Sequence, residues 1–310
     1  MAFAQGSRSG LSYLVESTFG TTPAGNFATI PYNTHSLNLT KERVTGNEIQ
    51  PDRMLRVDRH GNRQAGGDIT VDLRDGNFDA FLESAMQGTW DNTPTGPDVL
   101  KVGTTPKYFS IEDAANDISQ FRLFTGMSVG SMSFSITPNQ MVTSTIGMLG
   151  KDMAISGTGK TVDAATIAQP FDSYSGDLAL GNVASSSVIA TVTSLEFSIN
   201  NALNPTFVIG DDSTPFLESG MATVEGTFSA YFEDETLINR FIDEVESELI
   251  VSVDDPTGAN TYSFGFPKIK INGADVSVDG QTSRIITMPF VALYDVTEET
   301  NFYIERPDTT

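Results

Sequence analysis

Apolar and polar residues alternate in several short segments of the chain. The alternation predicts strands over Asp68–Leu73, Gln120–Phe124, Ser131–Thr137 and Met141–Met148. Strict alternation is typical of a sheet that buries one face and leaves the other polar. The sequence therefore favours a β-rich protein.

Two segments follow the period of a helix instead. Within Phe78–Gln87, apolar residues recur at the spacing that forms one helical stripe. A second stripe predicts a helix over residues 237–249, carrying Leu237, Ile238, Phe241, Ile242, Val245 and Leu249. Each helix is expected to pack one face against a sheet.

The second half of the chain repeats the first half weakly but in order. The strand, acidic turn and helix that begin at Gly67 have a counterpart beginning at Gly226. Upstream, Ser36–Thr40 matches Ser194–Ser198, and downstream Phe124–Ile136 matches Phe266–Val278. Three matches in the same order indicate a duplicated β-rich unit.

The predicted fold is mainly β with minor α, in two tandem β-sandwich or half-barrel domains with one packed helix each. We expect an N-terminal arm over residues 1–36 and a first domain over 37–153. A linker over 154–192 leads to a second domain over 193–310, which includes a C-terminal tail. A chain of 310 residues is long enough for two cores of ordinary size.

In both copies a long segment, expected to be irregular, separates the first two strands. These segments are Lys41–Gly66 and Ala202–Glu225, and long loops in compact domains are usually functional. The first holds the one basic concentration, Arg53, Arg56, Arg59 and Arg63, whereas the second carries Asp211, Asp212 and Glu218. One interpretation is a solvated loop. The other is that the arginines contact the acidic segment of a neighbouring copy, since guanidinium groups pair well with carboxylates.

The composition restricts the possible partners. There are 40 acidic and 18 basic residues, giving a formal charge of -22, which opposes binding to nucleic acid and anionic membranes. The chain has no cysteine, which fits a reducing cytoplasm. The start lacks the pattern of a signal peptide, and no apolar run approaches the roughly 20 residues of a membrane span.

The sequence signals for a catalytic, cofactor or metal site are weak. Gly157–Thr161 is similar to the end of a phosphate-binding loop, but Ala154 occupies the position of the required first glycine. The two histidines, His35 and His60, have no metal-ligand spacing, and no nucleophile motif accompanies them. We therefore expect no catalytic residue, no cofactor and no metal.

The chain resembles the major tail tube proteins of long-tailed (siphovirus-type) bacteriophages. The resemblance rests on the opening segment LSYLVESTFGTTP (residues 11–23), the long loop between early strands, the helix-bearing sandwich and the duplication. It implies tail-tube-type domains whose rings stack into a hollow tube that conducts DNA from the capsid to the host. The long segments and the terminal arms would then connect rings, and the helices would pack outside the barrel.

The resemblance also implies the assembly and its partners. Because most members place one domain at each of six ring positions, two tandem domains imply a trimeric ring with pseudo-sixfold symmetry. Expected partners are other copies of the chain and the tape measure, terminator and distal tail proteins. DNA would pass without specific binding and no membrane would be involved. The protein would assemble in the host cytoplasm and reside in the virion tail.

Three other functions remain open at this point. A head–tail joining or tail terminator protein would form a single ring that does not stack. A bacterial surface or pilus-like subunit is disfavoured by the absence of an export pattern. A carbohydrate-active enzyme could use paired carboxylates, but the chain contains one tryptophan, Trp90, whereas sugar sites favour aromatic platforms.

Overall fold

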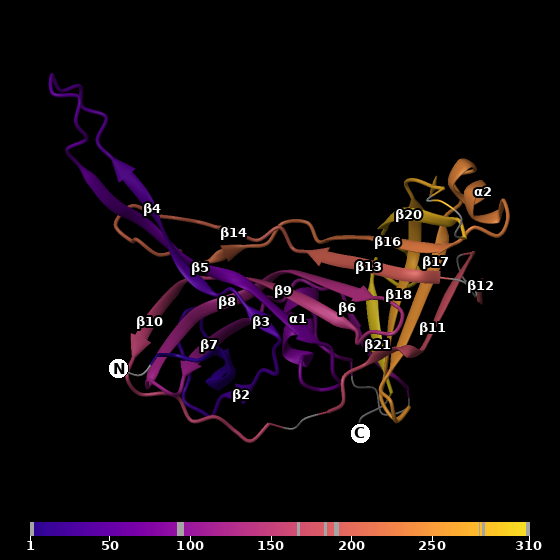
Figure 1. Cartoon of the computed structure of the whole chain (residues 1–310), viewed down its shortest axis with the longest axis horizontal. Helices are drawn as coiled ribbons and strands as arrows, with labels where there is room; N and C mark the ends of the chain where they lie inside the picture. The colour runs from indigo at the N-terminus through magenta and orange to yellow at the C-terminus, as the bar shows by residue number, and fades with distance from the viewer. Residues whose placement is uncertain are drawn as a thin grey trace.

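The computed structural model describes residues 3–91, 96–165, 168–182, 185–188, 192–278, 280 and 283–307. The protein is mainly β with minor α, which confirms the predicted fold class (Figure 1). The elements of the first half are η1 (Gly6–Arg8), β1 (Ser9–Glu16), β2 (Ala28–Thr29), β3 (Thr34–His35), β4 (Asn38–Thr45), β5 (Asp58–Asp72), α1 (Asp79–Met86), β6 (Asp98–Lys101), β7 (Tyr108–Ala115), β8 (Gln120–Ile136), β9 (Thr143–Gly150) and β10 (Asp152–Ser156). Those of the second half are β11 (Asp172–Asn182), β12 (Ser185–Val188), β13 (Val192–Asn200), β14 (Asn204–Pro205), β15 (Leu217–Glu218), β16 (Thr223–Tyr231), α2 (Thr236–Ile242), β17 (Ser247–Asp254), β18 (Thr261–Ile271), β19 (Asp275–Val276), β20 (Ile285–Ala292) and β21 (Tyr303–Arg306).

The central sheet is antiparallel and runs through both halves of the chain. In the first half the strand order is β4, β5, β9, β8. In the second half it is β13, β16, β20, followed by β18 and β19. Strands β8 and β13 pair with each other and join the two parts into one sheet.

A second set of strands covers one face of this sheet. In the first half β2, β1, β7, β8 and β10 pair in that order. In the second half β12, β11, β17, β18 and β21 pair in the same order. The long strands β8 and β18 belong to both layers. The segments predicted as separate strands at Gln120–Phe124 and Ser131–Thr137 are therefore one continuous strand.

Helix α1 packs between the two layers of the first half. Its apolar stripe is buried as predicted, and Phe81 stacks on Phe109 of β7 with ring centroids 4.8 Å apart. The helix ends where Gln87 adopts a left-handed conformation with φ 48°. Its predicted bounds, Phe78–Gln87, coincide with the two capping residues.

Helix α2 is shorter than predicted. It ends at Ile242, and Glu244 turns the chain with φ 52°, so that strand β17 begins at Ser247. The prediction of a helix to residue 249 is wrong because Leu249, Val251 and Val253 are buried at alternate positions, the period of a strand. The end of the helical stripe coincides with the first residues of this strand.

The segment Lys41–Gly66 is not irregular. Strands β4 and β5 run through most of it as a hairpin that projects from the body, and we call residues 41–63 the arm (Figure 1). The strand pattern was missed because most of the arm is exposed to solvent on both faces, so burial imposes no alternation. The corresponding residues 202–222 contain only the short pair β14 and β15.

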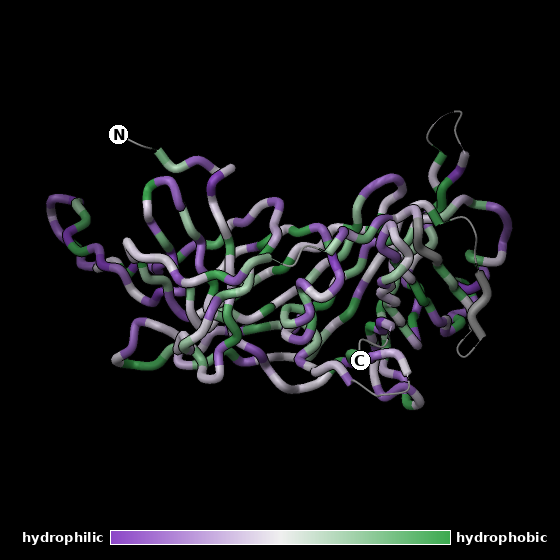
Figure 2. Tube along the Cα trace, turned by 90° about the horizontal axis from the view of Figure 1, so that it is seen from below, coloured by the Kyte–Doolittle hydropathy of each residue, from purple (hydrophilic) through white to green (hydrophobic). Residues whose placement is uncertain are grey.

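The predicted N-terminal arm (residues 1–36) and the predicted linker (residues 154–192) both contain paired strands. Strands β1 and β2 lie in the former, whereas β11 and β12 lie in the latter. Strand β1 pairs with β7, and β11 pairs with β17. Each of these segments therefore contributes to the second set of strands in its own half, which we call the outer layer. Hydrophilic and hydrophobic segments follow one another closely along the chain (Figure 2).

Candidate assembly surfaces

The junction between the two halves is a complete strand pairing. Residues 131–136 of β8 pair with residues 195–200 of β13, so that Ser133 lies opposite Ser198. Beyond the strand, the buried side chain of Asn201 donates from Nδ2 to the carbonyl oxygens of Ala85 and Val129, at 2.9 and 3.2 Å. The junction therefore binds α1 and β8 of the first half to the end of β13.

Two edges of the central sheet have no partner strand among the described residues. One is the outer edge of β3 and β4, which pair only with β5. The other is the outer edge of β19, which pairs only with β20. An unpaired edge exposes backbone N–H and C=O groups that another chain can bind. These two edges are therefore candidate sites for self-association.

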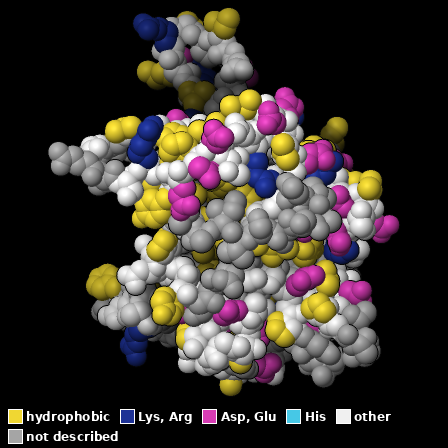
Figure 3. Space-filling model, turned by 90° about the vertical axis from the view of Figure 1, so that its right-hand side faces the viewer, with side chains coloured by type: hydrophobic (Ala, Val, Ile, Leu, Met, Phe, Trp, Pro, Cys, Tyr) yellow, Lys and Arg dark blue, Asp and Glu magenta, His cyan; other side chains and the backbone are white. Residues whose placement is uncertain are grey.

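The tip of the arm exposes apolar side chains. Ile49 is 99% exposed, Met54 69% and Leu55 57%. They line a hollow of about 320 Å³ formed by the tip itself. Basic and hydrophobic side chains both lie on this projecting part, which stands clear of the body in Figure 3. Large exposed apolar side chains gathered in this way indicate a surface that another molecule covers.

The four arginines predicted to contact another subunit lie along the arm. Arg63 at its base pairs with Asp212 at 3.3 Å and with Asp152 at 3.2 Å, both in the same chain. The backbone N–H of Arg63 also donates to the carbonyl oxygen of Asp212 at 2.7 Å. Arg56 forms an ion pair with Asp52, 2.6 Å away, whereas Arg53 and Arg59 are exposed.

The acidic residues of the predicted contact lie between β14 and β16. Asp211 accepts hydrogen bonds from the backbone N–H and hydroxyl of Ser213, each at 2.9 Å, which hold the pKa of its carboxyl below the usual value. Asp212 and Glu218 are exposed. The structure thus brings Arg63 and Asp212 together within one chain, where sequence reasoning had expected a contact between chains. The other residues of the set remain at the surface.

The polar face of the central sheet is a surface that sequence reasoning did not assign. It carries hydroxyl and acidic side chains, including Ser133, Thr145, Glu196, Thr227 and Glu225, which line a groove of about 590 Å³. No Lys or Arg occurs in residues 66–72, 131–135, 143–149, 196–200 or 223–229, whereas Lys270 of β18 lies opposite Val291 on the same face and pairs with Glu244. The alternation of Ser and Thr with apolar residues was the available signal. It could not by itself distinguish a lumen from an outer surface.

No other kind of site stands out. Among the described residues, no group of three or more His, Asp or Glu side chains is arranged to hold a metal ion. None of the helices in the described part of the chain is both long and apolar enough to cross a membrane.

The free edges, the arm and the polar face are features of a self-assembling protein. No curated protein matches the sequence. Residues 6–292, however, match the family model described as phage tail tube protein, and the chain therefore belongs to the phage tail tube protein family.

Proposed function

We propose that three copies of this chain form a ring and that the rings stack into a hollow tail tube that conducts DNA from the capsid to the host. Membership of the family makes the protein a structural component of the phage tail rather than an enzyme, and implies self-assembly and association with other tail proteins. The proposal concerns the number of chains, their contacts and the passage of DNA. It rests chiefly on the two free sheet edges.

The strand pairings support two copies of one unit, residues 9–156 and 172–306, which we call the first and second copy. Val129 pairs with Met148 as Ile271 pairs with Phe290. Past an irregularity at the same place in both copies, Phe134 pairs with Ser144 as Val276 pairs with Ile286. A shared register that includes its irregularity favours a duplication over a chance likeness.

Matched glycines support the same equivalence. A Cβ atom at Gly67 would lie 2.6 Å from the carbonyl oxygen of Ser36, and one at Gly226 would lie 2.7 Å from that of Glu196. Both approaches exclude a side chain. In each copy, glycine therefore allows the first strand to pass close to the second.

The equivalence predicts how protomers pair. Ser133 corresponds to Asp275, and Ser198 corresponds to Asn38, so the β8–β13 junction has its counterpart in the edge of β19 and the edge of β3 and β4. These edges belong to opposite ends of the sheet within one chain. Each protomer can therefore pair with the next, and closure of a ring removes both exposed edges. Two copies per chain and six positions per ring give three chains.

Passage of DNA is supported by the polar face. In a closed ring the apolar face of the sheet remains packed against α1 and the outer layer, so the polar face lines the lumen. The groove on this face is lined by hydroxyl groups and carboxylates, including Glu196 and Glu225, and, among the described residues, by no Lys or Arg. Like charge keeps DNA from adhering to the wall.

The arm supports stacking. Residues 202–222 of the second copy lie on the first copy of the same chain, as the contact between Asp212 and Arg63 shows. By the same relation, the base of the arm lies on the second copy of the next protomer, and its tip reaches an adjacent ring. Arg53, Arg56 and Arg59 would there meet acidic side chains such as Asp211 and Glu218. The tape measure, terminator and distal tail proteins would bind the lumen and the tube ends.

Electron microscopy of the purified protein at rising concentration tests this function. We expect hollow tubes with a regular axial repeat, whose end-on views contain three chains per ring. A second candidate, a single-ring joining or terminator protein, predicts closed rings that never stack. Protein that stays monomeric at every concentration, also in the presence of tail-tip proteins, would contradict both.

The lumen assignment makes a separate prediction. Glu196→Lys with Glu225→Lys places cations on the polar face, and we expect the tubes to retain duplex DNA at low salt, with binding that weakens as salt rises. Fluorescence anisotropy of a short labelled duplex measures this. Glu233→Lys with Glu235→Lys, beside α2 and outside the polar face, changes the net charge equally and is expected to retain much less. Equal retention by both variants would contradict the assignment.

A further inference from the structure

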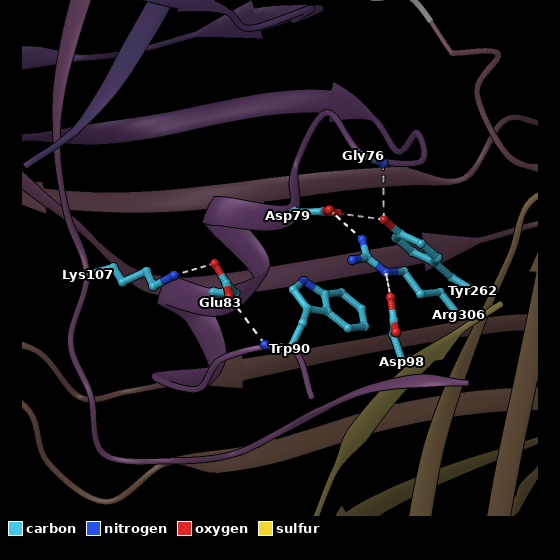
Figure 4. Close-up of polar contacts among 8 residues, drawn as sticks. All are labelled: Gly76, Asp79, Glu83, Trp90, Asp98, Lys107, Tyr262 and Arg306. Atoms are coloured by element: carbon cyan, nitrogen blue, oxygen red, sulfur yellow. Dashed lines mark hydrogen bonds and ion pairs between the residues drawn. The ribbon is translucent and has the colours of Figure 1, made fainter. Parts of the chain in front are cut away.

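A buried ion cluster connects the end of the second copy to the first copy (Figure 4). Arg306, the last residue of β21, is 9% exposed. Its Nε donates to Asp98 Oδ2 at 3.1 Å, and its Nη1 pairs with Asp79. Its guanidinium group lies over the ring of Trp90, 4.2 Å from the centroid. All three of these partners belong to the first copy.

The backbone reinforces this contact. Strand β21 pairs with β18 of its own copy and with β6 of the first copy, where Arg306 lies directly opposite Asp98. The fully buried Tyr262 of β18 adds a hydrogen bond from its hydroxyl to Asp79 Oδ1 at 2.8 Å. Burial and the nearby Asp79 raise the pKa of Tyr262, so the hydroxyl stays protonated and continues to donate.

Within the described part of the chain, the cluster has no counterpart at the other end of the duplicated unit. In the second copy, α2 ends at Ile242 and β17 begins at Ser247, which leaves no described strand equivalent to β6. In the first copy, Ile155 pairs with Arg122 as Ile304 pairs with Phe264, so Gly157 stands where Arg306 stands. The contact therefore exists within a chain and cannot form in the same way between chains.

We infer that the Arg306 cluster is a lock that fixes the second copy against the first and makes the junction inside each chain stronger than the junction between chains. Arg306 is a positioning residue, because it acts on the angle between copies through β21. The planar guanidinium group lies between two carboxylates and an aromatic face. It can keep these contacts in only one register of β21 against β6. Removing one member leaves a buried charge without its partner, which is strongly unfavourable.

The consequence for assembly rests on the proposed function. A ring would contain three locked junctions inside chains and three open junctions between chains. Each chain would then enter the ring as a preformed pair of copies already set at the ring angle. Rings would dissociate into whole protomers, and a free protomer would not exchange its second copy with another chain.

A nicked full-length protein tests the lock without any tube. A protease site is inserted between Ala164 and Ala165, in an exposed stretch between the copies, and is cleaved after folding. We expect the two fragments of otherwise wild-type protein to remain together on gel filtration. In Arg306→Met, their dissociation constant should rise on the order of 100-fold. Arg284→Met is the matched control, since Arg284 also lies over an aromatic ring, that of Phe232, but outside the junction.

Further variants distinguish a specific effect of the Arg306 cluster on the junction from a general effect on stability. Asp79→Asn, which keeps the pair between Arg306 and Asp98, should give an intermediate loss and serves if Arg306→Met does not fold. Arg306→Lys keeps the charge without the planar group and should also weaken the association. Fragments that separate equally in Arg306→Met and Arg284→Met would overturn the inference. Wild-type fragments that separate at once would overturn it too. Intact association in a protein that never forms tubes would contradict only the proposed function.

Discussion

A variant with Asn38→Cys and Asp275→Cys is expected to give covalent rings of three chains when its tubes are oxidised. The β8–β13 register predicts that these residues lie directly opposite each other between protomers. Directly opposed residues of antiparallel strands have Cα atoms about 4.5–5.5 Å apart, within the range that a disulfide spans. The natural chain has no cysteine, so no other disulfide competes. Gel electrophoresis without reductant measures the product.

The chain itself supplies the reference for this experiment. Ser133→Cys with Ser198→Cys places the same pair at the junction inside the chain, where it should close without changing the apparent chain number. Thr40→Cys with Asp275→Cys keeps the same face but shifts the register by two residues, and we expect a much lower yield. Efficient closure of the reference pair, with no linkage between Asn38 and Asp275 in assembled tubes, would refute the pairing of these edges.

Much of the fold was predictable because an element that buries one face carries apolar residues at regular spacing along the sequence. Strand β9 alternates buried and partly buried residues along its whole length, and α1 carries one buried stripe. In both cases one face packs against the core and the other does not. The prediction succeeded wherever a single buried face decided the choice of residues.

The predictions failed where burial does not determine the pattern of apolar and polar residues. The arm is solvated on both faces, so its strands show no alternation, and its arginines could be recognised as a cluster but not placed. Asn38 pairs with Gly66, and Ser198 pairs with Glu225. Under the proposed duplication Asn38 therefore corresponds to Ser198, two residues away from the sequence match of Asn38 with Glu196. A shift of two keeps the same face of a strand, and hydrophobic pattern alone cannot detect it.

The assembly surfaces were less accessible for a related reason. A free edge is a property of pairing among distant strands, and Asn38 and Asp275 carry no local sign of it. The Arg306 cluster likewise joins residues that are far apart in sequence, Asp79, Asp98 and Arg306. The chain contains many charged residues, and nothing in the sequence around these three distinguishes them from the others.

Replacement of Ile49, Met54 and Leu55 by serine is expected to abolish stacking while leaving the fold intact. These residues are exposed and lie on the arm, which projects from the body (Figure 1), so the variant should keep the wild-type unfolding temperature. Burial of a large apolar side chain contributes about 1.5 kcal/mol or more, and three of them about 4.5 kcal/mol or more for each arm. That corresponds to a factor on the order of 1000 in the equilibrium between rings and tubes, before the other arms of a ring are considered.

Sedimentation of tubes against protein concentration measures this loss, and circular dichroism with heating verifies the fold. The matched control is Glu48→Ser with Gln50→Ser, which alters polar side chains of the same tip and should leave assembly nearly unchanged. Arg56→Glu with Arg59→Glu then tests the charged part of the arm, where we expect weaker stacking that depends on salt, because exposed ion pairs are screened. If the serine variant forms tubes at the wild-type concentration, the apolar tip does not hold rings together. The arm would then bind only within its own ring, through its base at Arg63.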